Sequence, residues 1–316
     1  MITALAIVRT PNLFVAVMLS GVFSLLLAAN FFILDSPDVA LTEAAVGAGI
    51  STVLFLGALS LTAEHERAGS ANRFAALTVV TATSLVVIYA TLDKPPMGDP
   101  NAPVHQHVAP WYLKNTPELI DVPNIVTAVL ASFRGYDTLG EVFVVFTAGI
   151  GVLFLLGANP GKPAQPSRTP AFDSTKGLRH YLIPRVVGRL LVPFIVLFGL
   201  YVQFHGDYGP GGGFQAGAII AAGIILFGLI EGEDQALRVL PQRALMGLMV
   251  SGALLYGGVG VAGILLGGNF LDYSVLGSNP VAGQHIGILL IEIGVGLTVT
   301  GVLLSVFFAF AIRGKS

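Results

Sequence analysis

The chain has 316 residues, of which 54% are hydrophobic and 11% are charged, with a formal net charge of −2 at pH 7. Soluble domains carry about 25% charged residues, so this composition predicts a membrane protein in contact with the lipid bilayer, and nothing in it suggests a nucleic-acid partner. The chain has no cysteine, which excludes disulfides and thiolate-ligated metal centres within it.

Apolar runs of about 20 residues predict an all-α polytopic protein rather than a barrel of ten-residue strands. We expect eight spans: Asn12–Leu34, Ala40–Leu61, Arg73–Leu92, Thr138–Leu156, Val187–Phe204, Phe214–Ile230, Ala244–Gly267 and Gln284–Ile312. At ~1.5 Å per residue, each can cross ~30 Å of hydrocarbon, and the last is long enough to tilt or protrude. The first run is too long for the core of a cleavable signal.

The distribution of Lys and Arg predicts the orientation. With the N-terminus inside, only Lys94 and Lys114 of the 16 basic residues fall in outer segments, and Arg134 lies at the fourth span. Positive residues concentrate on the cytoplasmic side of membrane proteins. We therefore expect both termini in the cytoplasm.

Two connecting segments are long. Asp93–Asp121 contains several prolines and the only Trp, Trp111, so we expect an irregular exterior segment with no fold of its own. Asn159–Arg179 is rich in proline and basic residues, and it divides the chain into four spans and four spans.

The stretch from Phe133 to Glu141 puts one basic and two acidic side chains into an otherwise apolar region. The apolar residues 122–133 would make about 18 Å of helix, too short to span, and Arg134 then interrupts the pattern. A half-helix, a break and a helix over 122–157 is typical of the discontinuous helices found at ion sites. Asp137 and Glu141 are four residues apart and would share one helix face, where two close carboxylates can exchange protons or bind Na⁺ transiently. The alternative is an interfacial Arg134–Asp137 pair at the start of a helix.

Three further places carry titratable residues within or beside a span. Glu43 lies one turn into the second span, where it is either an outer-side ligand for a proton or cation or a residue that complements the helix dipole. His205 opens a glycine-rich outer connection that includes Gly211–Gly213, which is either an ion site or a tight hairpin. Glu292 lies in the last span with His285 seven residues before it on the same face, and an acidic residue at that depth indicates function or pairing between subunits. The glycines of the seventh span, Gly252, Gly257, Gly258 and Gly260, are most simply explained by close helix packing.

Several motifs together resemble a known family. The segment Pro37–Ala44 resembles an MbhD-type domain, Asn124–Val126 with Phe133–Glu141 resembles an MbhE-type domain, and Phe204–Gly206 with Pro210–Gly217 resembles the MrpB (MnhB) family. The resemblance implies an MbhD-like module at 1–72, an MbhE-like module at 73–158, a cytoplasmic linker at 159–182 and an MrpB-like four-helix domain at 183–316. MbhD-type domains usually begin with one more span, which here is either shortened or supplied by another chain.

The resemblance implies a subunit of an Mrp-type monovalent cation/proton (Na⁺/H⁺) antiporter complex in the bacterial plasma membrane. Its partners would be the other subunits of the complex, Na⁺, H⁺ and lipid, and no cofactor is expected. In the family, acidic residues of the MbhD- and MbhE-like parts are implicated in the cation route, which transfers to Glu43, Asp137 and Glu141. The large proton-pumping subunits have lysine-bearing broken helices, and no apolar span here carries a central Lys, so this chain alone would not be a complete antiporter.

Two rival interpretations remain open. The same modules occur in hydrogenases and complex I-like redox pumps, and the acidic residues of a purely structural scaffold would only pair across subunit contacts. A self-contained enzyme is not expected, because no nucleophile–base pair, nucleotide loop or metal-ligand spacing is visible.

Overall fold

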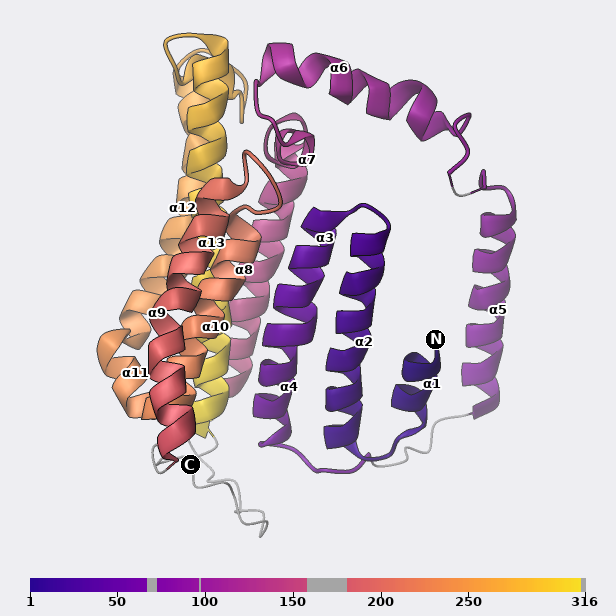
Figure 1. Cartoon of the computed structure of the whole chain (residues 1–316), viewed down its shortest axis with the longest axis vertical. Helices are drawn as coiled ribbons and strands as arrows, with labels where there is room; N and C mark the ends of the chain where they lie inside the picture. The colour runs from indigo at the N-terminus through magenta and orange to yellow at the C-terminus, as the bar shows by residue number, and fades with distance from the viewer. Residues whose placement is uncertain (67–72, 97, 158–180, 314–316) are drawn as a thin grey trace.

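The computed structural model describes residues 1–66, 73–96, 98–157 and 181–313 (Figure 1). Those residues fold into helices, with a single isolated β-bridge between Asn12 and His65. Eight helices are long and apolar enough to cross a membrane, which confirms the predicted spans. They are α2 (Leu13–Ile33), the continuous segment α3–η1–α4 (Pro37–Leu59), α5 (Arg73–Leu92), α8 (Gly135–Gly157), α9 (Leu182–His205), α10 (Gly213–Glu231), α12 (Gln242–Leu265) and α13 (Pro280–Arg313).

Helix α13 is the central element of the main bundle. It packs against α12, α10 and α8 and also contacts α4 and α9 (Figure 1). In its most apolar window, 67% of the residues are buried, a larger share than in any other described span. With 34 residues it is about 51 Å long, so it exceeds the hydrocarbon thickness, as expected for the last span.

Glycines allow α12 and α13 to cross closely. A Cβ added at Gly252 would lie 2.6 Å from the backbone nitrogen of Thr298, and one added at Gly294 would lie 2.8 Å from the carbonyl oxygen of Gly252. The packing explanation therefore holds for Gly252, and Gly260 also lies against an aromatic ring. It is not shown within this chain for the other two, because a Cβ at Gly257 or Gly258 would meet no described atom within 4 Å.

The segment 93–121 was expected to be irregular, but much of it is helical. A π-helical turn, η2 (Val104–Val108), runs into α6 (Ala109–Leu119), which crosses one end of the bundle from α5 toward α8 (Figure 1). Pro110 lies where the wide turn of η2 passes into α6, and Pro117 lies inside α6, so the helical segment contains two prolines. Trp111 and Tyr112 anchor α6 by packing on Phe133, with ring centroids 5.4 and 5.1 Å apart.

Helix α5 stands away from the other spans (Figure 1). Its described side chains, from Phe74 to Leu92, are all exposed, and none of its 18-residue apolar window is buried. A short helix, α1 (Ile2–Arg9), packs on α2. The predicted linker at Asn159–Arg179 lies outside the described residues, and the orientation across the membrane stays a prediction.

Candidate functional site

The predicted break between the half-helix and the fourth span is present. Helix α7 (Ile125–Thr127) continues as the π-helical turn η3 (Ala128–Phe133), and Arg134 then leaves the helical region with φ −121° and ψ 32° before α8 begins at Gly135. Wide π-type turns are frequent at functional sites. A second one, η1 (Glu43–Ile50), interrupts the second span.

Side chains from other elements satisfy the backbone at this break. The hydroxyl of Thr138 donates to the carbonyl of Leu130 at 2.8 Å. The buried hydroxyl of Tyr256 donates to the carbonyl of Gly135 at 2.8 Å, and that of Tyr273 donates to the carbonyl of Ala131 at 3.0 Å. Because a buried carbonyl without a partner is costly, these bonds stabilise a backbone course that a regular helix would not need.

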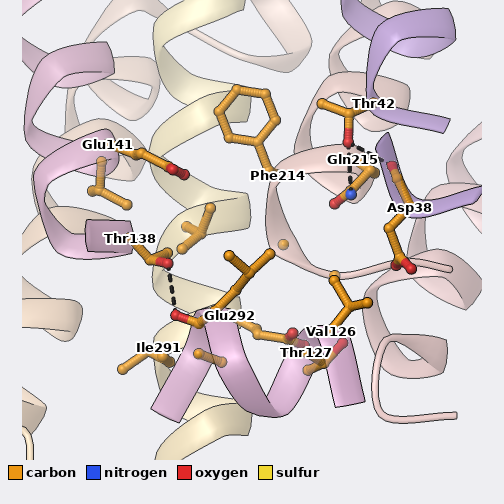
Figure 2. Close-up of a pocket in the computed structure, with 17 residues that line it drawn as sticks. Asp38, Thr42, Val126, Thr127, Thr138, Glu141, Phe214, Gln215, Ile291 and Glu292 are labelled. Atoms are coloured by element: carbon orange, nitrogen blue, oxygen red, sulfur yellow. Dashed lines mark hydrogen bonds between the residues drawn. The ribbon is translucent and has the colours of Figure 1, made fainter. Parts of the chain in front are cut away.

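A cavity of about 200 Å³ lies beside the break (Figure 2). Its lining comes from four places in the sequence: α3, the broken segment with α8, the loop before α10, and α13. The polar side chains and loop glycines of the lining are Asp38, Thr42, Thr127, Thr138, Glu141, Gly211, Gly212, Gly213, Gln215 and Glu292. No Lys, Arg or His is among the described residues that line it, so three carboxylates dominate its charge and favour cations.

Hydrogen bonds order the wall formed by α3 and α10. The side-chain amide of Gln215 donates to the hydroxyl of Thr42 at 2.8 Å, and that hydroxyl donates to the carbonyl of Asp38 at 2.9 Å. This leaves the Gln215 carbonyl oxygen free to accept. Figure 2 shows Phe214 between this wall and the Glu141 side of the cavity.

Glu292 lines another part of the cavity. It lies beneath the loop Gly206–Gly212, here named the glycine loop. A Cβ at Gly206 or at Gly212 would lie 3.2 Å from a Glu292 carboxylate oxygen, and a Cβ at Gly213 would lie 2.9 Å from the Glu292 carbonyl carbon. Gly212 also has φ +116°, which side-chain-bearing residues rarely adopt. These glycines thus allow both close packing on Glu292 and a positive φ. Glu292 lies about 18 Å along α13 from Pro280, deeper than the predicted start of the span implied.

Asn124 joins the glycine loop to α7 and to Asp38 of α3. Its Nδ2 donates to the carbonyls of Gly206 and Gly209 at 3.2 and 2.9 Å, and it lies 3.5 Å from Oδ1 of Asp38. Its Oδ1 caps α7 by accepting from the Val126 N–H at 3.0 Å. The hydroxyl of Thr127 adds a buried bond of 2.7 Å to the Gly206 carbonyl.

The structure separates the predicted charge cluster. Arg134 and Asp137 form an ion pair in the first turn of α8, with side chains 59% and 50% exposed, which is the arrangement of the alternative interpretation. Glu141, one turn further on, lines the cavity and remains close enough for Asp137 to act on it electrostatically. Asp137 and Arg134 are not among the lining residues.

Three other predicted residues, Glu43, His205 and His285, lie outside the cavity lining. The Glu43 carboxylate lies against Gly47, beside the hydroxyl of Ser24 on α2. His205 stacks on Tyr201, with ring centroids 4.8 Å apart, at the end of α9. The glycine loop that follows is a tight connection whose Tyr208 and Gly209 amides donate to the His205 carbonyl.

Comparison with known proteins identifies the three parts that build this cavity. Family models for two MBH subunits, MbhD and MbhE, match residues 1–64 and 73–169, and a "Domain related to MnhB subunit of Na+/H+ antiporter" matches residues 183–305. The "Putative antiporter subunit mnhB2" of Staphylococcus aureus (strain Newman) is 33% identical over 133 residues, which cover 41% of this chain and 94% of that protein. The chain belongs to the Mrp/Mnh antiporter subunit family.

This member of the Mrp/Mnh family also resembles longer proteins along nearly its whole length. A probable K(+)/H(+) antiporter protein of the A/B type from Rhizobium meliloti (strain 1021) is 26% identical over 94% of this chain, which spans 32% of that protein. A chain of the Mrp complex from Dietzia sp. DQ12-45-1b superposes with a TM-score of 0.76 and 27% identity over 98% of this chain and 34% of that chain. The chain thus spans about a third of the length of these relatives.

A redox complex is also similar. A chain of the membrane-bound sulfane sulfur reductase, an archaeal respiratory membrane complex, superposes with a TM-score of 0.54 and 29% identity over 74% of this chain and 97% of that chain.

Each of the three matched domains of this Mrp/Mnh protein contributes to the cavity lining. Asp38 falls in the MbhD match, Glu141 in the MbhE match and Glu292 in the MnhB match, so each domain contributes one carboxylate. The sequence analysis did not select Asp38, Gln215 or Asn124 as site residues. The available signal was their position: Asp38 and Gln215 stand beside the predicted starts of the spans Ala40–Leu61 and Phe214–Ile230, and Asn124 stands near the start of the predicted half-helix 122–133.

Proposed function

We propose that this chain is a membrane subunit of a multisubunit monovalent cation/proton antiporter, and that its three-domain cavity forms part of the ion path. The observation that carries the proposal is the cavity with one carboxylate from each domain and no basic residue among its described lining. Charge at membrane depth is costly and is usually retained for function. The similarity to an A/B-type antiporter protein and to the Mrp complex supports the same conclusion.

The cavity has the size and polarity for a partly hydrated monovalent ion. A volume of about 200 Å³ accommodates an ion with several waters, since a water takes up about 30 Å³. Carboxylate, hydroxyl and carbonyl oxygens are ligands suited to hard cations. A cation and a proton would therefore compete for Asp38, Glu141 and Glu292, and the two could not fully occupy the site together.

Partner subunits would close the path. Glu141 lies about 9 Å along α8 from Gly135 and is exposed on the surface of this chain. A carboxylate at that depth needs water, a cation or a polar partner. We infer that other subunits of the complex cover this side and couple occupancy of the cavity to proton flux, in the plasma membrane of a bacterial cell.

The test is cation-dependent dissipation of a pH gradient in inverted vesicles from a host without its own antiporters. The host carries the full set of subunits, and Na⁺ and K⁺ are tested separately. Glu141→Gln and Glu292→Gln should each lower the exchange rate by roughly tenfold or more with assembly intact, because removal of one preorganised charge contact typically costs about 2 kcal/mol or more.

The control removes the surface ion pair as a unit, with Arg134→Gln plus Asp137→Asn. This double variant should retain exchange, because neither side chain lines the cavity. Retained exchange in both glutamate variants, in an assembled complex, would make the cavity carboxylates structural. Loss of exchange in the ion-pair variant alone would return the path to Arg134 and Asp137.

A membrane module of a redox-driven ion pump is the second candidate. The superposition that covers 97% of a sulfane sulfur reductase chain favours it. The same cavity could serve either complex, so the partners decide. Absence of any Na⁺ or K⁺ response in the natural complex, together with co-purification of an iron–sulfur protein, would support this candidate.

A further inference from the structure

Two titratable residues beside Glu292 have no part in the cavity lining. Asp207 belongs to the glycine loop, and His285 lies two turns before Glu292 on α13. The loop end of the bundle is the end at which α9 meets α10, opposite the C-terminus (Figure 1). The inference drawn from them rests on the proposed function, because it concerns access to the same cavity.

The glycine loop brings Asp207 next to Glu292. Gly206, the residue before it, lies against one Glu292 carboxylate oxygen, and Gly212 lies against the other. The loop is held in this place by the Asn124 backbone N–H, which donates to the Asp207 carbonyl at 2.9 Å. The Asp207 carboxyl lies close enough to both His285 and Glu292 for their charges to interact with its own.

The charges around Glu292 come from every side. Asp207 faces it from the loop, His285 is on the same face of α13, and Glu141 and Asp38 lie across the cavity on α8 and α3. From α12, Tyr256 is committed to the Gly135 carbonyl. In the part of the chain that the structure describes, no hydrogen bond or ion pair reaches the Glu292 carboxylate, which leaves it available for protons.

We propose that Asp207 and His285 form a proton entry that connects the loop end of the bundle to Glu292 and through it to the cavity. All three side chains are partly exposed, but only Glu292 is among the described residues that line the cavity, and it lies beneath the glycine loop that carries Asp207. A proton that arrives at the loop end would therefore reach Asp207 and His285 before it enters the cavity at Glu292. Each transfer moves one proton between neighbouring groups and leaves the covalent structure unchanged.

The titration of Asp207 agrees with this role. Burial raises the pKa of the Asp207 carboxyl above its usual range, and the nearby positive charge of His285 opposes part of that rise. Asp207 therefore keeps a proton to a higher pH than an exposed aspartate does.

The first test measures proton access to Glu292 without using transport. The assembled complex is transferred to D₂O at a pH where Glu292 is protonated, and infrared difference spectra follow the carbonyl stretch of its carboxyl, assigned by its loss in Glu292→Gln. The double variant Asp207→Asn plus His285→Gln should slow the deuterium shift on the order of 100-fold, since a positioned donor or acceptor accelerates proton transfer by about 10² to 10⁴.

The control is the double variant Asp35→Asn plus His105→Gln, which makes the same two types of substitution at the same end of the molecule. Both side chains are exposed, and Asp35 has φ +58°, which asparagine tolerates. The control should exchange at the natural rate. An Asp207/His285 variant that also exchanges at the natural rate, or a Glu292 band that is absent at every pH, would overturn the proposed entry.

Vesicle exchange assays separate this inference from the proposed function. If the path is correct, the double variant should reduce the maximal exchange rate while leaving the cation concentration for half-maximal rate unchanged, because Asp207 and His285 do not line the cavity. A natural complex that exchanges cations, with a double variant unchanged in rate, would refute the entry alone. A natural complex without exchange would refute the proposed function, and the infrared test would still decide the entry.

Discussion

Replacing Asn124 by aspartate should loosen the glycine loop without disturbing the helix that Asn124 caps. Aspartate caps helices as well as asparagine does, so the bond from the Val126 N–H is kept. The two donors to Gly206 and Gly209 are lost, and a carboxylate then faces two carbonyl oxygens. Each lost bond is worth about 0.5–1.5 kcal/mol net. The free energy of loop opening should therefore fall by about 1–3 kcal/mol.

Hydrogen–deuterium exchange of the assembled complex measures this opening. The amides of Tyr208 and Gly212 are bonded to the carbonyls of His205 and Val202, so they exchange only when the loop opens. A loss of about 1–3 kcal/mol corresponds to exchange faster by roughly 5- to 150-fold. Asn124→Ala should give similar loosening and should also destabilise α7, because the cap is worth about 1 kcal/mol.

The matched control is Asn115→Asp on α6, whose amide donates only to the Trp111 carbonyl within its own helix, at 2.7 Å. This variant should leave loop exchange unchanged. If Asn124→Asp also leaves the Tyr208 and Gly212 amides as protected as in the natural chain, then Asn124 does not hold the loop, and the account of the three-domain junction fails.

Four further substitutions test other parts of the structure by thermal unfolding of the assembled complex. Gly252→Ala should lower the midpoint because its Cβ would clash with the backbone of α13. Gly257→Ala, whose Cβ would meet no described atom within 4 Å, should raise the midpoint, because alanine stabilises a helix by up to about 1 kcal/mol relative to glycine. Tyr256→Phe should destabilise by about 0.5–1.5 kcal/mol because it removes a buried hydrogen bond to the Gly135 carbonyl; an unchanged midpoint would show that water replaces the hydroxyl. Asp207→Asn should flatten the pH dependence of the unfolding midpoint. Because the pKa of Asp207 is raised in the folded state, the stability it contributes is present below its unfolded pKa of about 3.9 and is lost as pH rises through the folded value. An equally steep pH profile in the variant would contradict the burial of Asp207.

Hydrophobicity was enough to predict the spans and the break. Each span is a local property of about 20 residues, and the break at Arg134 is visible because a half-length apolar run precedes a charged tripeptide. The prolines of the segment 93–121 misled the same reasoning. They were weighed as helix breakers wherever they occurred, although Pro110 lies where the wide turn of η2 passes into α6 and Pro117 lies inside α6.

The cavity was less accessible to prediction because it depends on contacts between distant segments. Asn124 reaches Asp38 across 86 residues and Gly206 across 82, and no local pattern encodes such pairing. The charge cluster drew attention to Asp137 because three charged residues are close in sequence. Spacing alone could not show that Arg134 would pair with Asp137 at the surface while Glu141 turned toward the cavity.

The junction also predicts that the covalent link between the two halves is dispensable. The third domain matches a Staphylococcus aureus protein over 94% of that protein's length, so this domain also exists as a separate chain. Here the halves meet through α8 and α13, through Asn124 and through the Arg313 guanidinium, which donates to the Leu156 carbonyl. None of these contacts needs residues 158–180.

Cutting the chain between residues 158 and 180 and expressing both pieces with the remaining subunits should therefore give halves that co-purify and a complex that retains cation exchange. The control cut lies within the glycine loop, between Tyr208 and Gly209. That cut should abolish exchange, because it frees the segment that covers Glu292 and accepts from Asn124. If the linker cut separates the halves, their contacts are too weak to build the cavity, and an ion path shared by the three domains would require the fusion itself.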